Sequence, residues 1–275
     1  MKTTILIDNA PDELGVLEAE HGLAMLVEGD GRRMLIDTGL TGAFIDNARR
    51  AGISLEGLDF CLLSHGHNDH SGGLRRLLES VPETRVYLSK HILRERYFTA
   101  RHGGRRDIST DAETLRSFAD RLIPLTGSMW LADGVAAVCC SHGEFPTPLG
   151  NVFLSKEAGA GLVRDDFAHE MALAVKTSHG IVVFSSCSHG GAINIMRSCQ
   201  DFTGEERVAA FVGGLHFVDC QRTEQEVAAF AEALRATFPE TEIFTGHCTS
   251  DKAKRFLCEA VSGIHFFRTG EQFEV

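Results

Sequence analysis

The sequence lacks any apolar run long enough to cross a membrane as a helix. Hydrophobic residues make up 43% of its 275 positions, but no stretch approaches the ~20 consecutive apolar residues that a membrane helix needs. The opening MKTTILIDNAPDELG also lacks the apolar run of a secretion signal. We therefore expect a cytoplasmic protein with no membrane partner.

Positive charge is scarce. Lysine and arginine number 27 against 38 aspartate and glutamate residues, which gives a formal net charge of −11. Proteins that bind nucleic acid through its phosphates usually carry an excess of positive charge. We therefore expect no nucleic-acid partner.

The chain also lacks paired cysteines, repeats and linkers. Its eight cysteines form no CxxC pair, and without an export signal a disulfide framework is not expected. No segment rich in proline or glycine divides the sequence. We predict a single domain over residues 1–275, which is long enough to bury a large core.

Short apolar runs recur along the chain, and each leads into a polar or histidine-bearing loop. Continuous apolar runs of this length are typical of strands covered on both faces. The predicted strand regions are RRMLIDTG (32–39), LDFCLLSHGH (58–67), RVYLSKH (85–91), GVAAVCCSHGE (134–144), GIVVFSSCSHGG (180–191), RVAAFVGGLHF (207–217) and TEIFTGHC (241–248).

Helical patterns alternate with these strands. The predicted helices are TGAFIDNARRAG (41–52), GGLRRLLESV (72–81), TEQEVAAFAEALRATF (223–238) and DKAKRFLCEAV (251–261). In the third, Thr223 precedes Glu226 by three residues, which predicts a capping box. The alternation indicates an α/β fold with layered sheets. In such folds ligands gather at the carboxyl ends of strands, so we expect one shared site there.

Residues 91–121 differ from the rest because they are polar and rich in arginine. We predict a helical insertion, which would serve as a lid or as a contact in a homodimer. Its arginines, at positions 94, 96, 101, 105 and 106, are suited to clamping a phosphate. A solvated helical face with no ligand is the alternative.

The stretch LSHGHNDHSGG, residues 63–73, concentrates titratable groups. His65 and His67 are two positions apart, so in extended backbone their rings point to the same side. Asp69 and His70 follow at a turn. Buried imidazoles this close cannot all be protonated, whereas neutral imidazole and carboxylate are both metal ligands. The spacing therefore predicts metal ligation by His65, His67, Asp69 and His70, with Gly66, Gly72 and Gly73 allowing a tight path.

This motif, placed after MLIDTG, resembles the metallo-β-lactamase fold superfamily. EHGLAMLVE, CSHGGAINI, GGLHF and GHCTSDKA further resemble the subfamily of dihydropterin–ribofuranosylaminobenzene 5′-phosphate synthases. The resemblance extends over nearly the whole chain. It implies an αββα four-layer sandwich with a mono- or dinuclear metal site at one edge.

The resemblance also implies residue roles. His189 and His247 would join the four motif ligands, Asp69 would also act in catalysis, and Asp37 would support the metal-site loop. His216, His142 and His21 would contact the substrate or support the ligands. The superfamily often has an aspartate that bridges two metals after a late strand, but this chain has SSCSH there. Cys187 is then either a ligand or structural.

A further departure lies in DDFAHEM, residues 165–171. The subfamily has acidic residues here, which Asp165, Asp166 and Glu170 match, but His169 stands where a carboxylate is expected. His169 is therefore assigned no role in the site.

The cofactor implied is one or two divalent metal ions, with zinc preferred and iron or manganese as alternatives. Three functions remain open. One is a transferase that joins a pterin methyl group to an aminobenzene and releases pyrophosphate. Another is a hydrolase of an ester, thioester or phosphodiester, and the third is a ligand-binding or sensor protein without turnover. In each case we expect a small-molecule partner, and a phosphorylated one for the enzymes.

Overall fold

The computed structural model describes residues 1–101 and 103–275. His102, within the predicted insertion, lies outside the described residues. The chain divides into two compact units. The first consists of Met1–Thr126, Phe153–His169 and Phe267–Val275, and the second of Gly127–Val152 and Glu170–Phe266. The single domain over 1–275 and the lid or insertion role of 91–121 stay predictions.

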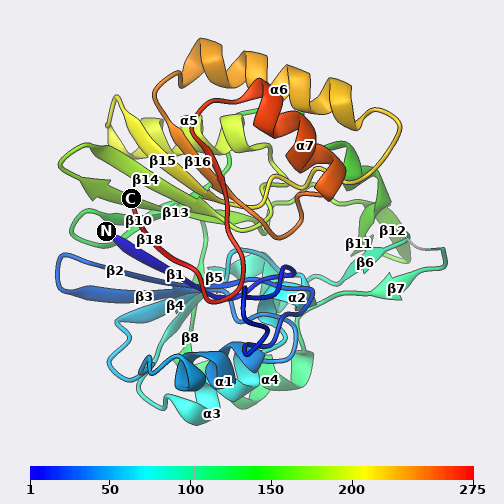
Figure 1. Ribbon diagram of the computed structural model, residues 1–275. Coiled ribbons are helices and arrows are strands. Elements are labelled where there is room, and N and C mark those ends of the chain that lie inside the picture. Colours follow the sequence, from blue (N-terminus) through cyan, green and yellow to red (C-terminus); the bar gives the residue numbers. More distant parts are fainter. Residues whose placement is uncertain (102) are drawn as a thin grey trace. The chain divides into compact units, whose positions relative to one another are not determined.

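The first unit is built on a seven-stranded sheet in the order β18-β1-β2-β3-β4-β5-β8 (Figure 1). Neighbours from β18 to β3 are antiparallel, and those from β3 to β8 are parallel. The strands are β1 (Lys2–Ile7), β2 (Ala24–Gly29), β3 (Arg32–Ile36), β4 (Phe60–Leu62), β5 (Val86–Ser89), β8 (Leu122–Leu125) and β18 (Gln272–Glu274).

Helices α1 (Ala43–Arg50), α3 (Leu74–Ser80) and α4 (Ala112–Ser117) cover one face of this sheet (Figure 1). The unit also contains α2 (Asn68–Ser71) and the 3-10 turns η1 (Lys90–Leu93) and η2 (Ala119–Arg121). Phe44 of α1 and Leu77 of α3 are fully buried against strand residues such as Leu26 and Leu35. This apolar packing holds α1 and α3 against the sheet, and α3 directly follows the segment that carries the histidine motif.

The arginine-rich segment is mixed rather than helical. Besides α4 it contributes β6 (Tyr97–Thr99) and β7 (Arg106–Asp107) to a four-stranded sheet, β12-β11-β6-β7. The other strands are β11 (Leu154–Ala158) and β12 (Gly161–Arg164). The helical expectation failed because Tyr97–Thr99 pairs with Leu154–Lys156, a distant segment that local periodicity does not reveal. Arg96 forms ion pairs with Asp107 and Glu157.

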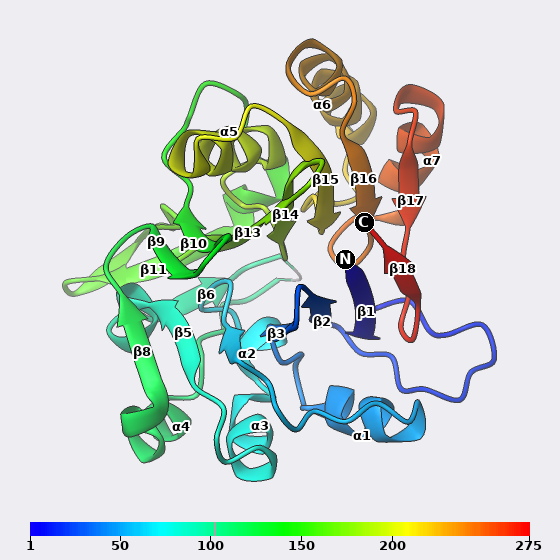
Figure 2. The same cartoon turned by 90° about the vertical axis from the view of Figure 1, so that its left-hand side faces the viewer.

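The second unit repeats the arrangement of the first. Its sheet has the order β17-β16-β15-β14-β13-β10-β9, antiparallel from β9 to β14 and parallel from β14 to β17. Figure 2 shows α5, α6 and α7 packed along this sheet. The elements are β9 (Met129–Ala132), β10 (Val135–Cys139), η3 (Leu149–Phe153), β13 (Met171–Thr177), β14 (Gly180–Ser185), α5 (Ala192–Thr203), β15 (Val208–Gly213), α6 (Thr223–Thr237), β16 (Glu242–Thr245), α7 (Asp251–Ala260) and β17 (Ile264–Phe266).

Each of the seven predicted strand regions contains a strand, and each of the four predicted helices is present. The capping box at α6 is wrong. The Thr223 hydroxyl accepts from the Cys220 N–H and donates to the Val218 carbonyl, so it turns away from the helix. The N-cap is Arg222. The Glu226 side chain accepts the Leu149 N–H instead of capping the helix. Within the described residues, no helix has the length and apolar character required to cross a membrane.

Candidate functional site

The histidine motif of the first unit gathers its rings in the protein interior. His65 and His67 follow β4, and His70 lies in α2; all three are buried. The ring centroids of His65 and His67 are 4.6 Å apart, and those of His65 and His70 are 4.2 Å apart. The structure thus brings together three of the imidazoles that the sequence predicted as ligands.

Close packing explains the two glycines after the motif. Gly72 and Gly73 have ordinary helical backbone angles, with φ of −67° and −80°. A Cβ atom at Gly72 would lie 1.9 Å from the Leu40 carbonyl oxygen, and one at Gly73 would lie 2.1 Å from the Thr38 oxygen. The absence of a side chain at either glycine lets the end of α2 and the start of α3 lie directly against residues 38–42.

Asp37, at the end of β3, organises the motif. Its carboxylate accepts the Ser64 N–H (2.7 Å), the Ser64 hydroxyl (2.6 Å) and the His70 Nδ1–H (2.8 Å). Because the Ser64 hydroxyl donates to Asp37, it accepts from Nδ1 of His65, 2.8 Å away. Both His65 and His70 therefore carry a proton on Nδ1. Nε2 is then the nitrogen of each ring that would bind a metal. A histidine held in this way is oriented to ligate a metal.

Asp69 lies beside these rings and is partly accessible, with 15% of its side chain exposed. Its carboxylate is 3.4 Å from Nε2 of His70 and 3.4 Å from Nε2 of the exposed His21, whose Nδ1 contacts Asn9. Burial lowers the pKa of His70, but Asp69 and Asp37 outweigh it and raise the pKa to about 10. The same two carboxylates would stabilise a metal cation in place of that proton.

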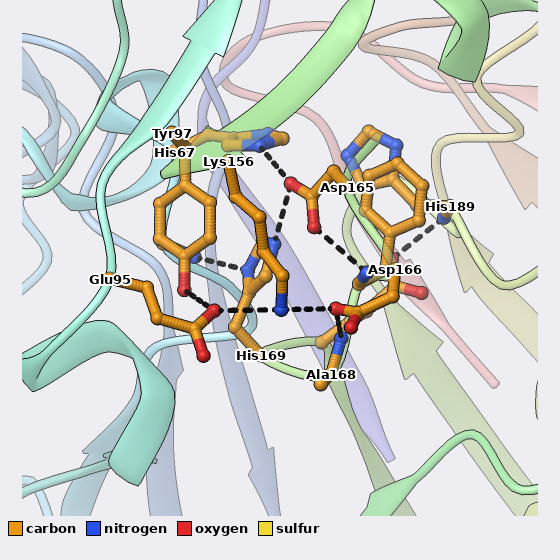
Figure 3. A network of polar contacts seen from close by, with 12 residues as sticks. His67, Glu95, Tyr97, Lys156, Asp165, Asp166, Ala168, His169 and His189 are labelled. Atoms are coloured by element: carbon orange, nitrogen blue, oxygen red, sulfur yellow. Dashed lines mark hydrogen bonds and ion pairs between the residues drawn. The ribbon is translucent and has the colours of Figure 1, made fainter. Parts of the chain in front are cut away.

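A second group surrounds His67 (Figure 3). The ligand atoms of His67, Asp165 and His169 lie within 4.8 Å of one another, and all three residues are buried. His169 accepts the Gly66 N–H on Nδ1 (2.9 Å), so its Nε2–H donates to Asp165 (3.1 Å). The same Asp165 oxygen is 3.8 Å from Nε2 of His67. Tyr97 packs on the His169 ring with centroids 4.0 Å apart.

The charges of this group favour a neutral His67. Burial lowers the pKa of His67 below its usual value. Burial alone would raise the pKa of Asp165, but hydrogen bonds with His169 and His67 hold it well below the usual range. Sequence reasoning missed Asp165 and His169 as site residues. The departure from the acidic pattern in DDFAHEM was the one available signal.

The second unit places His189, His216 and His247 after three consecutive parallel strands, β14, β15 and β16. All three are buried, and the rings of His189 and His216 are 4.3 Å apart. Nδ1 of His189 donates to the Asn151 side-chain oxygen (3.1 Å), and Glu170 accepts the His189 backbone N–H (2.7 Å). His216 and His247 have left-handed backbones, with φ of 52° and 33°.

Two cysteines join this region. The ligand atoms of Cys187, His216 and Cys248 lie within 4.8 Å of one another, and the His216 N–H donates to the Cys248 sulfur (3.2 Å). Burial alone would raise the pKa of the Cys248 thiol, but its contacts with Cys187 and His216 hold that pKa well below its usual value. Sequence reasoning missed Cys248, because no spacing pattern marks it.

His142 lies in a different environment. It is 20% exposed, and its ion-pair partners among the described residues are Asp201 (2.7 Å) and Glu144 (3.9 Å). Its predicted role in substrate contact or ligand support stays a prediction.

The donors within each unit suit a divalent metal. His65, His70 and His189 each direct Nδ1 at a hydrogen-bond acceptor, which leaves Nε2 as the basic nitrogen, the form in which histidine ligates metal. Asp69 supplies a carboxylate beside His70. Imidazole and carboxylate together suit zinc, iron or manganese.

A family profile described as the metallo-β-lactamase superfamily matches residues 17–187. A 7,8-dihydropterin-6-methyl-4-(β-D-ribofuranosyl)-aminobenzene-5′-phosphate synthase of Methanocaldococcus jannaschii is 26% identical over 265 residues, covering 88% of this chain and 85% of that protein. An uncharacterized protein of the same organism is 27% identical over 217 residues, 78% of each chain.

Among solved structures, the crystal structure of a metal-dependent hydrolase of the β-lactamase superfamily is similar to this chain. It has a TM-score of 0.83 and 27% sequence identity, and the match covers 100% of this chain and 99% of that one. The predicted α/β metallo-β-lactamase fold is thereby confirmed.

Proposed function

This chain belongs to the metallo-β-lactamase superfamily, and we propose that it is a metal-dependent enzyme acting on a phosphate-bearing small molecule. The observation that carries this proposal is the buried histidine cluster braced by Asp37. Its rings have their Nδ1 atoms directed at Asp37 and Ser64, and such bracing orients ligating histidines. The resemblance to the pterin-linked synthase supports a phosphorylated substrate.

The proposed ligands are His65, His67, Asp69, His70, His189 and His247. Asp37 orients His65 and His70. His21 contacts Asp69, which suits it to positioning that carboxylate, and His216 contacts the ring of His189. One or two divalent ions are proposed, with zinc preferred. A bound divalent cation stabilises negative charge on an attacking or a leaving oxygen.

The favoured reaction is the transfer named by the relative. The bond between a pterin methyl carbon and a diphosphate oxygen would break, and pyrophosphate would leave with the electron pair. A new bond would form from that carbon to a nitrogen or ring carbon of the aminobenzene, which then loses a proton. Asp69 is positioned to accept this proton because it is partly accessible and adjoins His70 and His21.

Hydrolysis is the second candidate. The structural relative with a TM-score of 0.83 is described as a metal-dependent hydrolase. In this reaction Asp69 would accept a proton from the attacking water, and an ester, thioester or phosphodiester would be the substrate.

A product assay separates the two. Purified, zinc-loaded protein is incubated with a dihydropterin methyl diphosphate, with and without 4-(β-D-ribofuranosyl)aminobenzene 5′-phosphate. Pyrophosphate release that requires the aminobenzene supports the transferase. Release without it, or turnover of ester, thioester or phosphodiester substrates, supports the hydrolase. A metal-loaded protein inactive on all of these substrates would contradict the proposed activity. Homodimer formation and cytoplasmic location stay predictions.

A further inference from the structure

An apolar cavity of about 260 Å³ lies wholly within the second unit. Its walls come from the segment 145–149, the start of α5, the residues that follow β15, and one side of α6. The apolar lining includes Phe145, Leu149, Ile193, Phe217 and Phe230. Small-molecule pockets are concave, mostly apolar and supplied with a few polar groups, and they typically measure roughly 300–1,000 Å³. This cavity approaches the lower end of that range, which suits a small ring system.

Glu226 is the acidic group of this cavity. One oxygen, Oε1, accepts the Leu149 N–H at 2.6 Å. The other, Oε2, is buried and has no hydrogen-bond partner among the described residues. Burial raises the pKa of the carboxyl, and the Leu149 N–H opposes that shift. A buried carboxylate oxygen without a partner is costly, so its environment is completed best by a ligand that donates hydrogen bonds.

The cavity wall continues directly to the candidate ligands of this unit. Gly150 follows Leu149 and is packed so closely against His216 that a Cβ there would lie 2.8 Å from the ring. Asn151 comes next and holds Nδ1 of His189. A molecule in the cavity therefore lies beside the segment that positions His189 and His216.

The chemistry of the lining selects among ligands. Aromatic side chains favour a flat unsaturated ring, and a carboxylate favours a pair of adjacent N–H donors on its edge. Arg222 also lines the cavity and can neutralise an acidic substituent. A purely aliphatic ligand would leave the Glu226 oxygen buried and unsatisfied.

We propose that this cavity binds the nitrogen heterocycle of the substrate, with a ring N–H and a neighbouring amino group donating to Glu226. The assignment rests on the proposed function, because it places the pterin half of that substrate. It makes Glu226 the residue that distinguishes an amino-substituted ring from its oxo analogue.

The test is a binding titration with two fluorescent probes, pterin (2-amino-4-oxopteridine) and lumazine (2,4-dioxopteridine), on the purified full chain. The wild-type protein should bind pterin about tenfold tighter than lumazine, because lumazine presents an oxygen where pterin presents its amino group. Glu226→Gln should weaken pterin binding by about tenfold and remove the preference, since the amide no longer supplies a carboxylate. Glu224→Gln is the matched control: it lies on the same helix, is exposed and is not part of the cavity lining.

A second pair of variants tests the cavity itself. Ala229 and Ala228 are both exposed on α6, but only Ala229 lines the cavity. Ala229→Phe should fill the space and reduce binding of both probes, whereas Ala228→Phe should leave both affinities unchanged.

The outcomes separate the two proposals. No saturable pterin binding by wild type, or an unchanged pterin-to-lumazine ratio in Glu226→Gln, would overturn the cavity assignment even if the enzyme turns over. Selective pterin binding that depends on Glu226, in a metal-loaded protein that shows no turnover, would uphold the assignment while the proposed reaction fails.

Discussion

Both units place candidate site residues at the ends of sheet strands, but the spacing of these residues along the sequence differs between the units. In each, site residues follow the strand at which the sheet changes from antiparallel to parallel pairing and the parallel strand beside it. Asp37 follows β3 and the histidine motif follows β4 in the first unit, whereas His189 follows β14 and His216 follows β15 in the second. In the first, His65, His67, Asp69 and His70 lie within six consecutive residues. In the second, each histidine follows a separate strand. The first arrangement is visible in local spacing, whereas the second depends on strand order.

The bracing of the histidines differs as well. Carboxylates hold the rings of the first unit, through Asp37 on His70 and Asp165 on His169. In the second unit the amide of Asn151 holds His189. Negative charge next to a ligating histidine raises its basicity. We therefore expect the first unit to contribute more to metal affinity than the second.

The largest effect should come from removing a ring. His67→Ala is expected to remove bound metal and to lower activity by about 1,000-fold or more, because several kcal/mol of charge stabilisation is lost. His189→Ala should have the same direction of effect. Elemental analysis and turnover are the measurements, with the exposed His179→Ala as the control. Unchanged metal content in His67→Ala would remove the motif from the ligand set.

Packing in the first unit should come next. Gly72→Ala places a Cβ within 1.9 Å of the Leu40 carbonyl oxygen, and overpacking of this kind costs about 3 kcal/mol. Because the backbone of Gly72 is helical, the loss would be steric and not conformational. Gly143→Ala, where nothing lies within 4 Å of the added atom, is the control. Denaturant unfolding of both variants measures the difference, and equal stabilities would show that the motif loop is not tightly packed.

The bracing residues provide the sharpest test of the comparison. Asp37→Asn keeps the shape of the side chain and tolerates the left-handed backbone (φ 61°). It should weaken metal binding by about 10–100-fold, because the charge beside His70 is lost. Asn151→Ala in the second unit should cost about tenfold at most, since it removes neutral hydrogen bonds. Competition with a zinc chelator measures both, and a larger loss in Asn151→Ala would reverse the ranking.

The smallest effect concerns pH. The pKa of Glu226 is raised in the folded protein by burial. A carboxyl group with a raised folded pKa stabilises the fold below its unfolded pKa, near 4.5, and that stability is lost as pH rises through the folded pKa. Glu226→Gln should therefore unfold about 1–2 °C higher than wild type at pH 7 and at nearly the same temperature at pH 4. Thermal scans at the two pH values measure this, and a variant less stable than wild type at pH 7 would be inconsistent with a costly buried carboxylate.

The features that depend on residues close together in the sequence were predictable from it. The strands around β4 and β14 were readable because their apolar runs are continuous, and the gathering of His65, His67 and His70 because their spacing is short. Asp165 and His169 were not predictable as partners, since their pairing depends on the Gly66 N–H about a hundred residues away. The local pattern predicted that Glu226 caps α6. Its carboxylate instead accepts the backbone N–H of Leu149, 77 residues earlier in the chain.

The backbone at His216 and His247 has a wider consequence. Both residues adopt left-handed angles, in which any side chain other than glycine costs about 1 kcal/mol or more. Glycine would relieve that cost, but it would leave a cavity where a buried imidazole packs. The strained backbone therefore persists only because the surrounding structure holds both side chains in place.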